Sequence, residues 1–273
     1  MNDRQLLEQY AITPKKSLGQ NFLHDPNVLE KIVALAELPP GATVLEIGPG
    51  TGNLTRILAR HAAHVIAVEL DDRLLPLLAT ELANTNVELV HADFLTVNVG
   101  ELVADTPYSV VANVPYYITS AILRHLLDHP PRPQRLVMTV QREVAERLVA
   151  QPGDMSLLAV SVQFFGQPQI AMRLNPAAFW PRPDVESAVL RVDVYDQPMV
   201  NVPDERLFFR VVKAGFAQKR KQLRNALSAG LGINKTQADH LLDTAGIEAQ
   251  RRAETLSLVE WARLAFALAD SNP

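Results

Sequence analysis

Short apolar, β-branched runs recur along the first two thirds of the chain, separated by segments with helical periodicity. Four runs predict buried parallel strands, at residues 44–47, 65–70, 87–93 and 109–114. Apolar residues at helical spacing lie between them: Leu54, Ile57 and Leu58 in one gap, and Leu74, Leu77, Leu78 and Leu82 in the next. This alternation is typical of a doubly wound α/β sheet with helices on both faces.

Three later runs predict further strands, at residues 135–141, 158–165 and 187–194. The longest uncharged stretch, residues 155–172, is interrupted by polar residues and a proline. A membrane span needs ~20 mainly apolar residues, so we expect this stretch to be buried strand instead.

A domain boundary is predicted in the polar segment 195–205, which contains two prolines and has no helical pattern. Beyond it the chain has amphipathic helices, glycine breaks near Gly230 and Gly246, and a capping box at Ser257 and Glu260. We therefore expect a sheet domain over residues 1–198 and a small all-α domain over residues 199–273.

Composition excludes several classes of protein. Hydrophobic residues make up 48% and charged residues 21%, as in soluble globular proteins. The chain has no cysteine, which excludes disulfides, Cys-ligated metals and thiol catalysis. The two histidine pairs at helical spacing, His61/His64 and His125/His129, have no acidic ligand pattern around them, so we expect no metal. The first twenty residues lack the apolar core of a signal peptide, so we expect a cytoplasmic protein.

A glycine-rich turn follows the first predicted strand, with Gly48, Gly50 and Gly52 in G-x-G-x-G spacing. Such a turn either lets backbone N–H groups approach a ligand or is simply tight. The spacing differs from the G-x-G-x-x-G dinucleotide fingerprint. Glu46, just before the turn, would repel a pyrophosphate but suits the ammonium of an amino-acid group.

Acidic residues also end the next two strands. Glu69 could accept hydrogen bonds from both hydroxyls of a ribose, and Asp93 could accept from an exocyclic amine. Either carboxylate alone could instead cap the following helix. Together with Glu46 and the glycine turn, they indicate S-adenosylmethionine as cofactor, with NAD as the second candidate.

The fourth strand ends in Asn113-Val114-Pro115-Tyr116, which we interpret as a site for a planar amine. The Asn113 side-chain oxygen and the backbone carbonyl of Val114 or Pro115 could accept both N–H bonds of an adenine amine. That would free the nitrogen lone pair for attack, and Tyr116 could stack on the base, worth about 1–3 kcal/mol. The alternative is a loop asparagine beside a core tyrosine.

The charge is unevenly distributed, although the chain as a whole carries −4. Residues 206–235 hold eight Lys or Arg and no acid, leaving 18 basic and 30 acidic residues, or −12, elsewhere. A helix through residues 218–225 would place Lys221 and Arg224 on adjacent turns, facing phosphates. Charge runs are usually only solvated surfaces, but the missing acids favour RNA binding. The RNA-binding candidates are Lys15, Lys16, Lys219, Arg220, Lys221 and Arg224.

Five segments, in this order, resemble the rRNA adenine N6-dimethyltransferases, most closely the bacterial small-subunit (16S) enzymes. They are ITPKKSLGQNFL (12–23), VLEIGPGTGNLT (44–55), ANVPYYITSAIL (112–123), FWPRPDVESAVLRV (179–192) and FAQKRKQLRNAL (216–227). The resemblance runs from about residue 12 to residue 268. It implies a Rossmann-like methyltransferase sheet that uses S-adenosylmethionine to dimethylate N6 of two adjacent adenosines in a loop near the 3′ end of 16S rRNA, with a role in small-subunit biogenesis.

The resemblance also implies residue roles. It implies cofactor contacts from Asn21, Leu23, Gly48, Glu69, Asp93 and Asn113, and stacking of Phe179 on the flipped adenine opposite Tyr116. Read without the family, Phe179 could be plain core and Asn21 a helix cap. The implied reaction is direct methyl transfer without a dedicated general base, so positioning carries much of the rate. We expect a monomer that acts on a precursor of the small ribosomal subunit.

Two other functions stay open at this stage. One is N6 methylation of large-subunit (23S) rRNA, as in the macrolide-resistance enzymes, although the tail at residues 246–265 resembles the small-subunit type. The other is a non-catalytic RNA-binding assembly factor, against which the intact Gly48, Glu69 and Asn113 argue.

Overall fold

The computed structural model describes residues 3–271. Contacts divide the chain into two compact units. The first unit combines residues 1–145 with 168–194, and the second combines residues 146–167 with 195–273.

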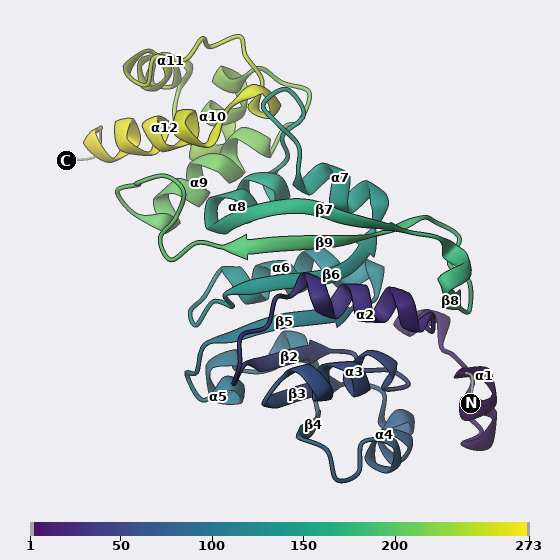
Figure 1. The fold of residues 1–273 in the computed structure, drawn as a ribbon. Coiled ribbons are helices and arrows are strands. Elements are labelled where there is room, and N and C mark those ends of the chain that lie inside the picture. The colour runs from purple at the N-terminus through teal and green to yellow at the C-terminus, as the bar shows by residue number, and fades with distance from the viewer. Residues whose placement is uncertain (1–2, 272–273) are drawn as a thin grey trace. The chain divides into compact units, whose positions relative to one another are not determined.

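The first unit is built on a seven-stranded sheet in the order β4-β3-β2-β5-β6-β9-β7 (Figure 1). Its strands are β2 (Thr43–Ile47), β3 (His64–Glu69), β4 (Val87–His91), β5 (Tyr108–Asn113), β6 (Arg135–Gln141), β7 (Gly166–Leu174) and β9 (Ser187–Val194). The five strands from β4 to β6 run parallel, and β9 pairs antiparallel with β6. A separate antiparallel pair joins β1 (Phe22–Leu23) to β8 (Phe179–Trp180).

Helices cover both faces of this sheet, with α2 and α3 in front of it in Figure 1 and α6 behind. The helices are α1 (Asp3–Gln9), α2 (Pro26–Leu35), α3 (Asn53–His61), α4 (Leu75–Glu81), α5 (Val99–Val103) and α6 (Thr119–Leu127). Ile32 of α2 and Leu58 of α3 are fully buried in one core cluster with Val44, Val111 and Val137 of the strands. The predicted α/β fold with helices on both faces is confirmed.

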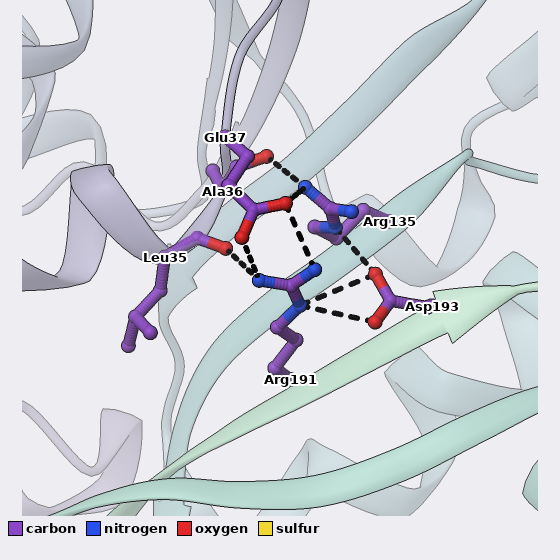
Figure 2. A network of polar contacts seen from close by, with 6 residues as sticks. All are labelled: Leu35, Ala36, Glu37, Arg135, Arg191 and Asp193. Atoms are coloured by element: carbon purple, nitrogen blue, oxygen red, sulfur yellow. Dashed lines mark hydrogen bonds and ion pairs between the residues drawn. The ribbon is translucent and has the colours of Figure 1, made fainter.

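An ion-pair network fixes the end of α2 to the sheet (Figure 2). Glu37 accepts hydrogen bonds from both terminal nitrogens of Arg191, at 2.6 and 3.0 Å, and pairs with Arg135 at 2.9 Å. Asp193 bridges the same two arginines from β9. Because Arg135 is the first residue of β6, this network lies at the amino-terminal ends of the parallel strands, opposite their carboxyl ends.

The second unit is helical. Its helices are α8 (Leu157–Phe165), α9 (Glu205–Phe216), α10 (Leu223–Leu231), α11 (Lys235–Thr244) and α12 (Leu258–Asp270), while α7 (Arg142–Leu148) leads into it from the first unit. Phe164 of α8 stacks on Phe208 of α9, with ring centroids 4.6 Å apart. The predicted capping box is confirmed: Ser257 accepts from the Glu260 N–H, and Glu260 accepts from the Ser257 N–H.

Two predictions about this region are wrong. Residues 158–165 form helix α8 rather than a strand, and the strand β7 begins only at Gly166, so residues 155–172 are not one buried strand. Ser156 caps α8 by accepting from the Ala159 N–H, and a short, mostly apolar run has no clear periodicity that separates helix from strand. The glycine break expected near Gly230 lies two residues further along, because α10 ends at Leu231 and Gly232 caps it with a φ of +71°.

The second unit also takes residues 146–167, which the sequence analysis assigned to the sheet domain. Within residues 3–271, no helix combines the length and the apolar character needed to span a bilayer.

Candidate functional site

A pocket lies where the carboxyl ends of β2, β3 and β5 meet, beside the segment that precedes and includes β1. Several predicted cofactor residues line it together: Asn21, Leu23, Glu46, Gly48, Gly50, Glu69 and Asn113. Pro115 and Tyr116 line the same pocket. The structure therefore brings the glycine turn, two strand-end carboxylates and the Asn113–Tyr116 loop to one cavity.

The glycine turn needs glycine for two separate reasons. Gly48 has a φ of +70° and a Cβ there would meet nothing within 4 Å, so the backbone lies open to a ligand. Gly50 has a φ of +59°, and a Cβ there would lie 2.9 Å from the Phe22 ring. The turn is thus packed against β1 at Gly50 and unobstructed at Gly48.

Glu69 is 6% exposed, and it joins the glycine turn to β3. Its carboxylate accepts from the Gly50 N–H at 3.2 Å and from the Asp71 N–H at 2.8 Å. Burial raises its pKa, while these backbone donors act in the opposite direction. Each carboxylate oxygen can accept a second hydrogen bond, so the group can receive the hydroxyls of a ribose.

Glu46 is 1% exposed, and its Oε2 has no hydrogen-bond partner within the described residues. Burial raises the pKa of this carboxyl to about 8, and the nearby Glu69 charge acts in the same direction. A buried, unpartnered carboxyl oxygen is costly unless a ligand pairs with it. A cationic amino group is such a ligand, so Glu46 fits the amino-acid end of S-adenosylmethionine.

Asn113 is oriented by a single hydrogen bond. Its side-chain Nδ2 donates to the Asn21 carbonyl at 3.0 Å. The side-chain oxygen has no hydrogen bond in the structure described, so it is free to accept one in the pocket.

A hydrogen bond to β9 fixes the Tyr116 side chain. The Tyr116 hydroxyl lies 2.6 Å from the Oγ of Ser187, the first residue of β9. Burial raises the pKa of this phenol, so it stays neutral at physiological pH. The half-buried ring keeps a fixed position at the pocket edge.

A hydrogen-bonded hub that the sequence analysis missed ties the segment beside the pocket to β3. The Gln20 side chain donates to Asp71 at 2.8 Å, and Arg73 donates to the same carboxylate at 2.5 and 2.8 Å. Arg73 also donates to the Thr13 carbonyl at 3.1 Å, so residues 13–20 are attached at both ends. These donors lower the pKa of Asp71 to about 2. The Lys15 N–H donates to Gln20, which orients its amide.

Gly19 brings this segment against the Asn113–Tyr116 loop. A Cβ at Gly19 would lie 3.1 Å from the Pro115 Cβ, closer than most real contacts. The only sign of this packing in the sequence is Gly19 itself, a glycine followed by Gln20.

Three predicted site residues do not line the pocket. Gly52 is the residue just before α3, with a φ of +79°, and belongs to the backbone of the turn rather than to the pocket lining. Asp93 is exposed and accepts from the Leu95 N–H at 3.0 Å, which is the capping alternative. Phe179 is 3% exposed and lies in the core with Leu23, so its stacking on adenine would require the ring to leave that position.

The predicted RNA-binding residues divide into two groups. Lys15, Lys16, Lys219, Arg220 and Lys221 are exposed. Arg224 instead pairs with Asp239 of α11 at 3.1 Å. The helix predicted through residues 218–225 is wrong, because α10 begins only at Leu223 and Lys221 lies in the turn before it. Within the described part of the chain, no three His, Asp or Glu side chains gather as a metal site would require.

Comparison with known proteins gives the same family from two directions. Residues 12–264 match the family model described as ribosomal RNA adenine dimethylase. A protein of Dehalococcoides mccartyi named ribosomal RNA small subunit methyltransferase A is 44% identical over 272 residues, covering 99% of this chain and 93% of that protein. A Moorella thermoacetica protein of the same name is 44% identical, covering 96% and 95%.

Two solved structures are similar over 91% of the chain. The 23S rRNA methyltransferase ErmE superposes with a TM-score of 0.71 at 30% identity and is covered completely. A dimethyladenosine transferase from Plasmodium falciparum superposes with a TM-score of 0.78 at 23% identity and is covered to 98%, which shows a shared fold.

Proposed function

The chain belongs to the ribosomal RNA adenine dimethylase family, and we propose that it methylates N6 of two adjacent adenosines near the 3′ end of small-subunit rRNA. S-adenosylmethionine is the methyl donor. The match to relatives named for the small subunit, over almost the whole chain, supports this substrate over large-subunit rRNA.

The orientation of Asn113 is the observation that carries the proposal. Because the Asn21 carbonyl takes the Nδ2 donor, the Asn113 oxygen is presented as an acceptor at the carboxyl end of β5. An adenine amine is a donor whose lone pair is delocalised into the ring. Accepting its N–H bonds, at Asn113 and at a backbone carbonyl of Val114 or Pro115, makes that lone pair available for attack.

The neighbouring residues position the base. The Tyr116 ring, anchored through Ser187, offers a flat face on which an unstacked adenine can lie. A base paired in a helix must first leave its stack, at a cost of a few kcal/mol, so an open loop is the favoured RNA substrate.

The cofactor residues fit a cationic methyl donor. Bound S-adenosylmethionine supplies an electrophilic methyl group on a sulfonium. Glu46 would pair with its amino group, Glu69 would accept from its ribose, and the open backbone at Gly48 would border it. These side chains bind and orient, and the methylated amine loses its proton readily without a dedicated base.

Three finer points belong to the same proposal. The RNA substrate is a precursor of the small ribosomal subunit, the protein acts as a monomer, and it works in the cytoplasm. In this proposal the sheet unit is the catalytic domain and the helical unit binds RNA.

Mapping the methyl label tests the substrate directly. Purified protein and labelled S-adenosylmethionine are incubated with small- and large-subunit particles from a strain that lacks the modification. We expect label on two adjacent adenosines near the 3′ end of small-subunit rRNA. Label confined to large-subunit rRNA, or none on either, would contradict the proposal.

Replacing Asn113 by alanine tests the site. Removing one preorganised polar contact typically lowers kcat by about 10²–10³-fold, and we expect Asn113→Ala to do so. The dissociation constant for S-adenosylmethionine, measured by calorimetry, should change by only a few-fold. Asn201→Ala, in an exposed loop of the other unit, serves as the control and should keep full activity. Normal turnover in Asn113→Ala would remove the role given to this loop.

A further inference from the structure

Tyr117 is an exposed aromatic side chain beside the pocket, and none of the roles proposed above uses it. It follows Tyr116 in a short 3₁₀ helix, Tyr116–Ile118, that begins directly after Pro115. Successive side chains of such a helix point to different sides, and Tyr116 lines the pocket while Tyr117 is 62% exposed. All five tyrosines of the chain lie within residues 3–271, and Tyr117 is the only exposed one among them.

The Tyr117 ring is held along one side by the backbone of Gly19. A Cβ at Gly19 would lie 3.3 Å from both Cδ1 and Cε1 of this ring, so only a glycine leaves it room to pack this closely. The φ of Gly19 is +59°, which any side chain there would make costly. The ring therefore has a fixed contact on one side, while most of its surface faces solvent.

The backbone segment that contacts Tyr117 also orients the asparagine of the site. The Asn21 side-chain Nδ2 donates to the Gly19 carbonyl at 3.1 Å, and the Asn21 carbonyl accepts from Asn113 at 3.0 Å. Gly19, Asn21 and Asn113 all line the pocket, so a ring in contact with Gly19 lies at the edge of that pocket. An exposed aromatic surface thus lies beside the position proposed for the target adenine.

Two exposed cations belong to the same turn. Lys15 and Lys16 are exposed, and the Gly19 N–H donates to the Lys16 carbonyl at 3.0 Å. Residues 9–24 contain no Asp or Glu, so no acidic side chain in this segment offsets these charges. Sites for single-stranded RNA combine cations along the backbone with aromatic rings on which successive bases stack. The turn offers both within a few residues.

We propose that Tyr117 is a stacking platform for the base next to the target adenine. This inference rests on the proposed function, in which the RNA presents two adjacent adenosines. When one adenine leaves its stack to enter the pocket, its neighbour loses a stacking partner. The Tyr117 ring replaces that partner, which offsets part of the cost of unstacking and holds the RNA during transfer. A purine stacks more strongly than a pyrimidine, so Tyr117 favours a purine at the neighbouring position.

The kinetics of methyl transfer to unmodified small-subunit particles test the platform. Tyr117→Leu keeps an apolar side chain without a ring, and we expect it to raise the KM for particles roughly 5- to 150-fold, as the loss of one base–aromatic stack does. Tyr117→Phe keeps the ring and should stay within about twofold of wild type. In both variants kcat and the dissociation constant for S-adenosylmethionine should change less than about threefold, because the pocket residues are not replaced.

Phe266→Leu is the matched control, because it removes an exposed aromatic ring from α12 in the helical unit. No RNA contact is assigned to Phe266, so its replacement should leave the KM for particles within about twofold of wild type. Calorimetry with S-adenosylmethionine on the same preparations checks that each variant has a folded pocket.

Changing the neighbouring base separates stacking from mechanical support of the Asn113 loop. In two further substrates each adenosine of the pair is replaced in turn by uridine, whose smaller ring stacks weakly. On at least one of them, kcat/KM per remaining adenosine should fall about fivefold or more with wild-type protein. With Tyr117→Leu it should fall less than about twofold on both, because the platform is already lost. A ring that only supported the loop would give the variant and wild type the same dependence on the neighbouring base.

Two results would overturn the inference. One is a wild-type KM for particles in Tyr117→Leu, and the other is a loss in that variant that does not depend on the neighbouring base. If the inference fails and the proposed function holds, wild type still labels both adenosines of the small-subunit RNA. If the proposed function fails, wild type does not label that RNA, and the inference fails with it.

Discussion

Glu37 occupies a left-handed backbone conformation, with a φ of +47°, directly after the end of α2. Glycine is the usual residue at this position, because a side chain there costs roughly 1–2 kcal/mol. The carboxylate offsets that cost through Arg191 and Arg135, as Figure 2 shows. Arg191 is well buried in the network, and these contacts raise its pKa further above its ordinary range.

Two substitutions at Glu37 separate backbone strain from ion pairing. Glu37→Ala loses the ion pairs and keeps the strained backbone, whereas Glu37→Gly loses the pairs and relieves the strain. We expect the alanine variant to be less stable than the glycine variant by about 1 kcal/mol in the free energy of unfolding. Urea denaturation of both variants measures this difference. Equal stabilities would mean that the conformation carries no cost in this protein.

At the scale of elements, the segment at residues 13–20 forms part of the pocket but is held through Asp71. The Gln20–Asp71 hydrogen bond and the Arg73–Thr13 hydrogen bond connect it to the loop after β3. The same loop presents Glu69, whose carboxylate accepts from the Asp71 N–H. Attachment of the segment and orientation of the Glu69 carboxylate, to which we assign the ribose in our proposal, therefore depend on one hub.

Gln20→Ala should loosen this segment without altering the strands. A hydrogen bond to a charged group contributes ~1.5–3 kcal/mol, so we expect the KM for S-adenosylmethionine to rise about tenfold or more. The kcat at saturating cofactor should change less than threefold, because Asn113 and Tyr116 are not replaced. Gln167→Ala, exposed on β7, is the matched control and should leave both constants unchanged. A loss confined to kcat would contradict the positioning role of Gln20.

The helices and strands that were predicted correctly are those whose pattern of apolar and polar residues matches the faces that are buried in the fold. The strands β2, β3 and β5 are mostly apolar because both faces of the sheet are covered, and α3 shows one apolar face because only one side is buried. α8 was mistaken for a strand because it is buried on nearly all sides. Its surroundings come from α9 and α12, which lie far away in the sequence.

The same distinction applies to the site at the scale of the whole molecule. Glu46, Glu69 and Asn113 could be found from the sequence because each is the last or next-to-last residue of a strand, and the carboxyl ends of parallel strands lie together on one side of the sheet. Gln20 could not be found in this way. Its role depends on Asp71, a partner 51 residues away that only the folded chain brings beside it.

Glu46 links cofactor binding to the stability of the entire molecule. Its pKa is about 8 in the folded protein, whereas an unfolded glutamate ionises near pH 4.5. Between these values the unfolded chain has lost the proton and the folded chain keeps it. Stability therefore falls as pH rises through this window, by up to about 1.4 kcal/mol per pH unit. Below pH 4.5 and above pH 8 the contribution no longer changes.

Glu46→Gln removes this titration, so its unfolding free energy relative to wild type should rise from pH 5 to pH 8 and then level off. The cationic cofactor favours the ionised carboxylate, so wild-type affinity for S-adenosylmethionine should increase with pH over the same window. The variant should bind more weakly, with a flatter pH dependence. Denaturation and calorimetry at pH 5, 6.5 and 8 measure both quantities. A stability difference that is constant with pH would show that Glu46 is already ionised, and weak binding would then need another cause.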